Sequence, residues 1–141
     1  MKKNGFTLVE LLAVIVIIGL LSSITLTRVN KFSSERKKQD YNNMVKLVEK
    51  NTSMLVSSDD DIYKKVTDKL TDINPKCSIS YQTLIDKDLV DARERNPITD
   101  DYINHNSYVI VSVDDDNGEL KYKFVNIDEE KNTEQPVSCL E

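Results

Sequence analysis

Residues 6–27, FTLVELLAVIVIIGLLSSITLT, decide what this chain can be. The stretch holds a single charged residue, Glu10. As an α-helix rising about 1.5 Å per residue it would span roughly 33 Å, which is enough for a hydrocarbon core of about 30 Å. We therefore predict a transmembrane helix over residues 6–27. Lys2 and Lys3 in front of it favour a cytoplasmic N-terminus, which places the rest of the chain outside.

The segment in front of this stretch is very short. A secretory signal is normally cut after its apolar region, at a site resembling Ala-x-Ala. Here the apolar run is followed by Ser22-Ser23-Ile24-Thr25, which is a poor site of that kind. Gly5 instead stands before the run, so cleavage between Gly5 and Phe6 would leave the whole helix on the mature protein. We predict a leader peptide over residues 1–5, cut at that bond.

Glu10 is the unusual residue of the apolar stretch. A carboxylate at the centre of a bilayer costs about 3 kcal/mol, and less near the end of a helix. One interpretation is that the side chain reaches the lipid headgroups or is protonated. The other is that cleavage exposes a cationic α-amine on Phe6, with a pKa near 8. The Phe6 amine of one copy could then pair with Glu10 of another, offsetting two charges that are costly to bury separately.

The sequence GFTLVE, residues 5–10, follows a short Lys-rich leader and precedes a long apolar run. In this combination it closely resembles the class III signal of type IV pilins and related pseudopilins. The resemblance implies that a prepilin peptidase cuts after Gly5 and methylates Phe6. It also implies that Glu10 aligns an incoming subunit against the Phe6 amine of another. Its implied partners are identical or related pilin subunits, an assembly ATPase and a polytopic platform membrane protein.

Helical periodicity continues beyond the apolar stretch. A stripe of apolar residues recurs at three- and four-residue steps and predicts an amphipathic continuation of the helix over residues 28–57; its members are Tyr41, Met44, Val45, Val48, Thr52 and Leu55. A second helix is expected over residues 62–70, capped by an aspartate of the run 59–61. After a turn at Asn74-Pro75, residues 80–89 favour a short helix and residues 92–106 a surface loop.

The clearest β-strand pattern lies nearer the C-terminus. Residues 108–113 form an apolar run, and Leu120, Tyr122 and Phe124 alternate with lysines. The Asn117-Gly118 pair between them favours a tight hairpin, because both residues tolerate positive φ. Residues 137–140 are a candidate third strand. The predicted fold is therefore α+β: a long N-terminal helix packed on a small antiparallel sheet, with a globular head over residues 58–141, as in type IV pilins.

The charge and the cysteines restrict the function further. The chain carries 19 basic and 24 acidic residues, a net charge of −5. That balance argues against direct nucleic-acid binding, which needs a clustered basic surface.

Cys77 and Cys139 are too far apart in sequence for a redox or zinc motif of the CxxC kind. In an exported domain they could form a disulfide, and the alternative is two unpaired thiols.

No motif indicates catalysis. His105 is the only histidine, and it lies in a polar loop without a recognisable triad or metal-site pattern. The acidic run before Gly118 fits a turn better than a calcium loop, because Val113 occupies the position where the first aspartate ligand is needed. The chain has three glycines and no glycine-rich phosphate loop. We therefore expect no enzyme activity, no cofactor and no metal.

The leading hypothesis is a prepilin, the precursor subunit of a type IV pilus or pilus-like filament. It would be held in the cytoplasmic membrane by a single span, in contact with lipid, and then assembled into a cell-surface filament. One alternative is a pseudopilin of a type II secretion or DNA-uptake system. The other is an extracellular binding module with a signal anchor that never polymerises.

Overall fold

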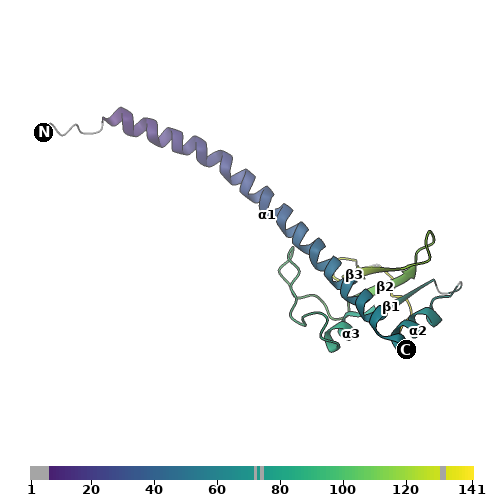
Figure 1. Cartoon of the computed structure of the whole chain (residues 1–141). Coiled ribbons are helices and arrows are strands. Elements are labelled where there is room, and N and C mark those ends of the chain that lie inside the picture. Colours follow the sequence, from purple (N-terminus) through teal and green to yellow (C-terminus); the bar gives the residue numbers. More distant parts are fainter. Residues whose placement is uncertain (1–6, 72, 74, 131–132) are drawn as a thin grey trace. The chain divides into compact units, whose positions relative to one another are not determined.

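The computed structural model describes residues 7–71, 73, 75–130 and 133–141, and for residues 23–30 it describes the backbone only. The predicted leader, with Gly5, and also Phe6, lie outside the described residues. The chain divides into two compact units, residues 1–39 and 40–141, which are described separately below. Figure 1 labels the helices and strands of both units.

The first unit consists of the N-terminal part of helix α1 (Leu8–Ser58). No helix in the described part of the chain combines the length and the hydropathy that a membrane span requires. The predicted span over residues 6–27 includes Phe6 and the side chains of residues 23–27, which are not described.

In the second unit, α1 lies across one face of the sheet (Figure 1). The predicted apolar stripe is confirmed: Met44, Val48, Thr52 and Leu55 are buried, Val56 joins them, and Tyr41 and Val45 pack at the margin. The helix ends at Ser58, one residue after the predicted end.

The second predicted helix is confirmed as α2 (Asp60–Lys69), with Ile62 and Val66 buried. Asp59 is its N-cap residue: its Oδ1 accepts hydrogen bonds from the backbone N–H groups of Asp61 and Ile62, both at 3.1 Å. These bonds satisfy amides that the first turn of a helix leaves without a backbone partner. The expectation of an aspartate cap is therefore confirmed.

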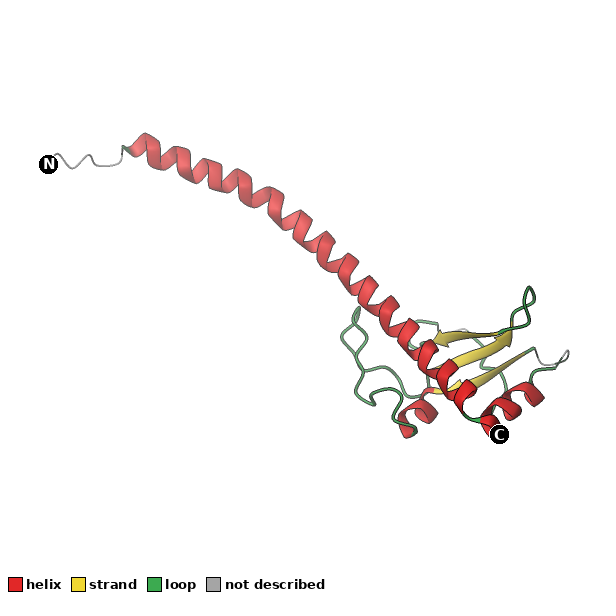
Figure 2. Cartoon of the chain, in the orientation of Figure 1, coloured by secondary structure: helices red, strands yellow, loops and turns green. Residues whose placement is uncertain are grey.

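The sheet has three antiparallel strands in the order β1 (Lys76–Ser80), β2 (Tyr108–Val113) and β3 (Leu120–Val125) (Figure 2). The two C-terminal strands are the predicted ones. Val111 of the central strand pairs with Cys77 on one side and with Tyr122 on the other. The buried core of this unit includes side chains from all three strands, among them Ile79, Val109 and Phe124, together with the α1 stripe.

The prediction of the third strand was wrong in its location. The third strand is β1, whereas residues 137–140 contribute only an isolated parallel bridge between Ser78 and Ser138. β1 has the sequence KCSIS, whose alternation is too short and polar to indicate a strand on its own. Pairing with the apolar β2 and burial of Cys77 and Ile79 make it one.

The hairpin between β2 and β3 also differs from the predicted tight turn. Val113 pairs with Leu120, which leaves residues 114–119 in the connection. Gly118 has φ 72°, but Asn117 does not adopt a positive φ. The Asp114 carboxylate accepts from Asp116 N–H at 3.1 Å and pairs with Lys121 Nζ at 2.8 Å. The Asp114 side chain thus stabilises a longer loop in which glycine alone needs the left-handed conformation.

A short helix, α3 (Tyr81–Asp86), begins directly after β1, in the region where a helix was predicted. The predicted loop over residues 92–106 is largely irregular and is anchored by Asn96, which is 4% exposed. Asn96 Nδ2 donates to Glu129 Oε1 at 2.7 Å, and Asn96 Oδ1 accepts from Ile98 N–H at 2.9 Å. The bond to Glu129 ties the loop to the turn that follows β3, and the bond from Ile98 holds the backbone of the loop itself.

The C-terminal tail is attached to the outer edge of β1. Ser78 N–H donates to Val137 O at 2.8 Å, and Cys139 N–H donates to Ser78 O at 2.9 Å. A disulfide joins Cys77 to Cys139, with their Cα atoms 5.1 Å apart and both residues fully buried. The last residues of the chain therefore belong to the folded head.

Glu49 of α1 closes part of the opposite edge of the sheet. Its Oε1 accepts a hydrogen bond from the backbone N–H of Phe124 in β3 at 3.0 Å. Because Phe124 is buried, removing the acceptor would strand an amide away from water. We expect Glu49→Ala to lower the free energy of unfolding by about 1–3 kcal/mol, measured by urea denaturation of the full chain in detergent.

Two variants separate this contact from nonspecific effects. Glu49→Gln keeps a carbonyl acceptor and should lose less than half as much stability. Lys46→Ala, at an exposed position of the same helix, should change stability by less than about 0.5 kcal/mol. Equal denaturation midpoints for Glu49→Ala and Lys46→Ala would contradict the role of the hydrogen bond.

Candidate functional site

The first candidate site is the start of α1, where Thr7 and Glu10 form a reciprocal pair. Thr7 N–H and its hydroxyl both donate to Glu10 Oε2 at 3.0 Å, and Glu10 N–H donates to Thr7 Oγ1 at 3.3 Å. Thr7 O accepts the first helical bond, from Leu11 N–H. This is a capping box, in which the side chains at the N-cap and three residues later satisfy each other's amides.

The capping contact gives Glu10 a role that the sequence analysis did not include. A threonine followed three residues later by a glutamate, directly before an apolar run, is a recognisable signal for it. Glu10 is exposed in the chain by itself, so its carboxylate remains accessible to a group from another molecule. Phe6, its predicted partner, and Gly5 are not described.

The N-terminal part of α1, on both sides of Glu10, exposes apolar side chains in every direction. Leu8 is 80% exposed and Leu20 65%, and the residues between them include Val9, Leu11, Ile15 and Ile18, each more than half exposed. A continuous apolar surface of this kind marks a contact with lipid or with other protein chains. A helix that is apolar all round suits burial on every side.

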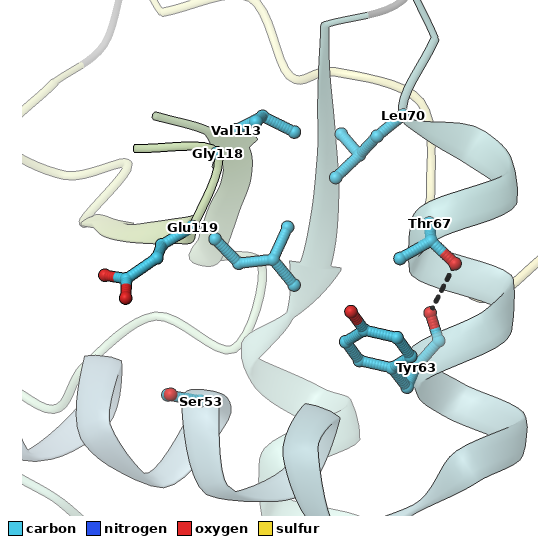
Figure 3. Close-up of a pocket in the computed structure, with 8 residues that line it drawn as sticks. Ser53, Tyr63, Thr67, Leu70, Val113, Gly118 and Glu119 are labelled. Atoms are coloured by element: carbon cyan, nitrogen blue, oxygen red, sulfur yellow. Dashed lines mark hydrogen bonds between the residues drawn. The ribbon is translucent and has the colours of Figure 1, made fainter. Parts of the chain in front are cut away.

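The second candidate is an open groove in the head, drawn in Figure 3. It is lined by one residue of α1, by α2 and its C-cap, and by the β2–β3 hairpin: Ser53, Tyr63, Thr67, Leu70, Val113, Gly118, Glu119 and Leu120. Thr67 Oγ1 already donates to Tyr63 O at 3.0 Å. The lining holds hydroxyl groups and one carboxylate beside aliphatic side chains, and the described residues that line the groove include no histidine, cysteine or lysine. These groups can make packing and hydrogen-bonding contacts.

The other polar groups that the structure describes in the head form no recognisable catalytic constellation. His105 is exposed, and its Nε2 lies 3.0 Å from Ala92 O. Within the described ranges, no group of three or more His, Cys, Asp and Glu side chains is placed to hold a metal ion.

Tyr81 is the most unusual titratable group of the head. Its ring packs against Phe124, with the centroids 5.8 Å apart, and the residue is 1% exposed. Its hydroxyl has no hydrogen-bond partner among the described residues. Burial, with smaller contributions from the carboxylates of Glu94 and Asp91, raises the pKa of Tyr81 to about 12. The phenol is therefore neutral at physiological pH.

We expect Tyr81→Phe to stabilise the head by about 1 kcal/mol at neutral pH, because it removes a buried hydroxyl that lacks a partner. A raised pKa means that the folded state holds the proton more tightly than the unfolded state. The contribution of Tyr81 to the free energy of unfolding is then fully present below about pH 10 and is lost as the pH rises toward 12. Tyr81→Phe should lose less stability over that range.

The measurement is urea denaturation of both chains at pH 7 and across the alkaline range. Tyr63→Phe serves as the control, because Tyr63 is half exposed. It should change stability by less than about 0.5 kcal/mol at pH 7. A clear destabilisation by Tyr81→Phe would show that the hydroxyl has a partner after all.

Comparison with known proteins gives one result. Residues 1–26 match the family described as the prokaryotic N-terminal methylation motif. No curated protein and no solved structure is significantly similar to the chain. The matched region contains Gly5, Phe6, Thr7 and Glu10 and ends before the head begins.

Proposed function

From the class III signal of type IV pilins and pseudopilins that this chain carries at residues 1–26, we propose that the protein is a prepilin that becomes a structural subunit of a type IV pilus or pilus-like filament. A motif of this family implies a membrane-anchored precursor, processing by a prepilin peptidase and assembly with pilin subunits. In this proposal the peptidase cuts after Gly5 and methylates Phe6.

The observation that carries the proposal is the methylation motif running into an apolar helix that is exposed on all sides. Such a helix would rest in the membrane before assembly and form the filament core afterwards, as a span over residues 6–27. Residues 28–57 would continue it into the head, residues 58–141, which lies outside the cytoplasm. Burial of the apolar helices between identical copies would supply most of the assembly energy.

In the assembled filament, Glu10 of one subunit would pair with the Phe6 amine of another. The contact joins different surfaces of identical chains, and such contacts generate open-ended helical filaments. Mispairing would leave a charge alone in an apolar environment, so the pair would set the axial stagger. An assembly ATPase and a platform membrane protein would drive extraction from the membrane.

Mass spectrometry of the mature N-terminus tests the proposal most directly. We expect a chain that begins with N-methylated Phe6, recovered from filaments sheared off the cell surface. Gly5→Leu should leave full-length precursor in the membrane. Isolated protein that still begins at Met1, or normal processing of Gly5→Leu, would refute the cleavage assignment.

The same preparation distinguishes the alternatives. A pseudopilin of a secretion or DNA-uptake system would be processed in the same way but recovered in short periplasmic or envelope-bound assemblies. A signal-anchored binding module would stay in the membrane fraction as single chains. Glu10 discriminates assembly from a lone anchor, because an anchor has no need of a carboxylate in its apolar stretch, and the acidic head argues against direct DNA binding.

A further inference from the structure

A ring of positive charge surrounds α1 in the first unit. Lys31, Arg36, Lys37 and Lys38, here called the basic collar, are exposed, and Glu35 is the acid among them. At about 100° per residue, Arg36 and Lys37 lie about 140° and 240° around the helix from Lys31. The collar therefore presents cations in several directions.

The four cations of the collar outnumber the one acid among them, Glu35. Within the described residues, its four side chains take part in no ion pair. Arg36 stacks over the Phe32 ring, 4.4 Å from its centroid, which leaves its guanidinium edge available. The acids that could match this charge must come from elsewhere.

The chain divides its charge between the two units. Residues 1–39 carry seven basic and two acidic residues, whereas residues 40–141 carry 12 basic and 22 acidic ones, a net charge of −10. Three ion pairs occur among the described residues of the head. At the hairpin, Asp114 is paired with Lys121, but the carboxylates of Asp115 and Asp116 have no partner among the described residues.

We propose that the basic collar of one subunit docks against the acidic heads of neighbouring copies of this chain, with the β2–β3 hairpin loop as a principal contact. This inference rests on the proposed filament function. In a filament of identical subunits, each helix has copies on several sides, and a collar that faces several directions can be matched by several heads. Complementary charge then selects the register in which collar and head meet.

Anionic lipid is the competing partner for a collar that follows an apolar helix. Basic clusters that hold helices to anionic lipid characteristically lie on the cytoplasmic side of the span. The proposed function requires leader processing in the cytoplasm, which would place this collar on the outer side. The large acidic excess of the head, carried by the same chain, favours a second copy as the partner.

The first half of the test reverses the collar in the full chain by Arg36→Glu, Lys37→Glu and Lys38→Glu. We expect the yield of sheared filaments to fall roughly tenfold or more, because like charges then face each other between copies. Cleavage after Gly5 and formation of the Cys77–Cys139 disulfide should be unchanged, which shows that the variant is processed and folded. Arg36→Lys keeps the charge and should assemble normally.

The second half reverses the hairpin loop by Asp115→Lys, Asp116→Lys and Glu119→Lys. This variant should also fail to assemble alone, because its hairpin loop then repels the collars of its neighbours. When the two reversed chains are produced together, each collar can meet a head of opposite charge. We expect filaments containing both chains to return to at least roughly half of the wild-type yield.

The outcomes separate this inference from the proposed function. If the wild-type chain forms filaments and the collar-reversed chain forms them equally well, the docking contact is overturned and the proposed function stays intact. Failure of the mixed chains to assemble would overturn it too. Cells that lack the assembly ATPase keep the chain in the membrane without filaments. If the collar-reversed chain were lost from the membranes of such cells, the partner of the collar would be lipid. A wild-type chain that begins at Met1 would instead refute the proposed function itself.

Discussion

We expect the Glu10→Ala chain to be cleaved after Gly5 as completely as the wild type and yet to be nearly absent from filaments. The physical reason is the Phe6 amine of the neighbouring copy, which would lie without a counter-charge among apolar helices. An unpaired buried charge costs several kcal/mol, which corresponds to a loss of roughly a hundredfold or more in incorporation. Immunoblots of sheared filaments and of membranes measure the two pools.

The capping box makes a sharper control possible. Glu10→Gln can keep the contacts with Thr7, because glutamine also serves at this position of a capping box, but it lacks the charge. It should fail to assemble like Glu10→Ala. Thr7→Ala removes the cap, at a cost of about 1 kcal/mol, and should still assemble. Normal filaments from Glu10→Gln would show that capping, and not charge pairing, is what the residue contributes.

The second large effect concerns the disulfide of the head. Replacing both Cys77 and Cys139 by serine should lower the free energy of unfolding by about 4 kcal/mol, because the bond closes a loop across 62 residues of sequence. That is a large fraction of the stability of a small domain. The shift in urea midpoint of the full chain in detergent gives the value.

A pair of exposed serines controls for the effect of a double substitution elsewhere in the chain. Ser57 and Ser58 are exposed at the end of α1, and replacing both by alanine should move the midpoint only slightly. If the double cysteine variant lost less than about 1 kcal/mol, the backbone bonds of the tail to Ser78 would be sufficient to hold it. The tail would then remain resistant to carboxypeptidase even under reduction.

Much of this fold could be predicted from local patterns. The stripe on α1 recurs at helical spacing over four turns, and β2 and β3 consist of β-branched, aromatic and alternating residues. Each pattern agrees with the tertiary structure, because the same apolar face that defines the period is the face that is buried. A cap by one aspartate of the run 59–61 was predictable because the run precedes an amphipathic stretch, and the structure shows that Asp59 is the one that caps.

The features that could not be predicted depend on neighbours distant in sequence. β1 is a strand because β2 lies beside it, and nothing within KCSIS requires this. In the sequence, Glu49 is indistinguishable from the other polar residues of the helix. Its role follows only from the structure, where its carboxylate accepts a hydrogen bond from the edge of β3. The longer hairpin loop is stabilised by the ion pair between Asp114 and Lys121. The Asn-Gly pair in the sequence favoured a shorter turn and gave no indication of this contact.

Within the candidate site, the motif at residues 5–10 could be recognised directly, because it consists of consecutive residues and does not depend on the fold. The role of Thr7 was also present in the sequence, as the first member of a capping box. The basic collar could be seen as a run of charge, but its meaning depends on the acid excess of residues 40–141. The net charge therefore has to be counted separately for residues 1–39 and 40–141.

Both edges of the three-stranded sheet carry an obstacle to further strand addition. The tail occupies β1 through the bridge at Ser78, and Glu49 takes the outward N–H of Phe124 in β3, a strand that also displays two lysines. In the proposed filament, crowded heads with free strand edges would risk pairing edge to edge into amyloid-like ribbons. Because both edges are occupied, subunits would join through their N-terminal helices, and neighbouring heads could touch without forming a common sheet.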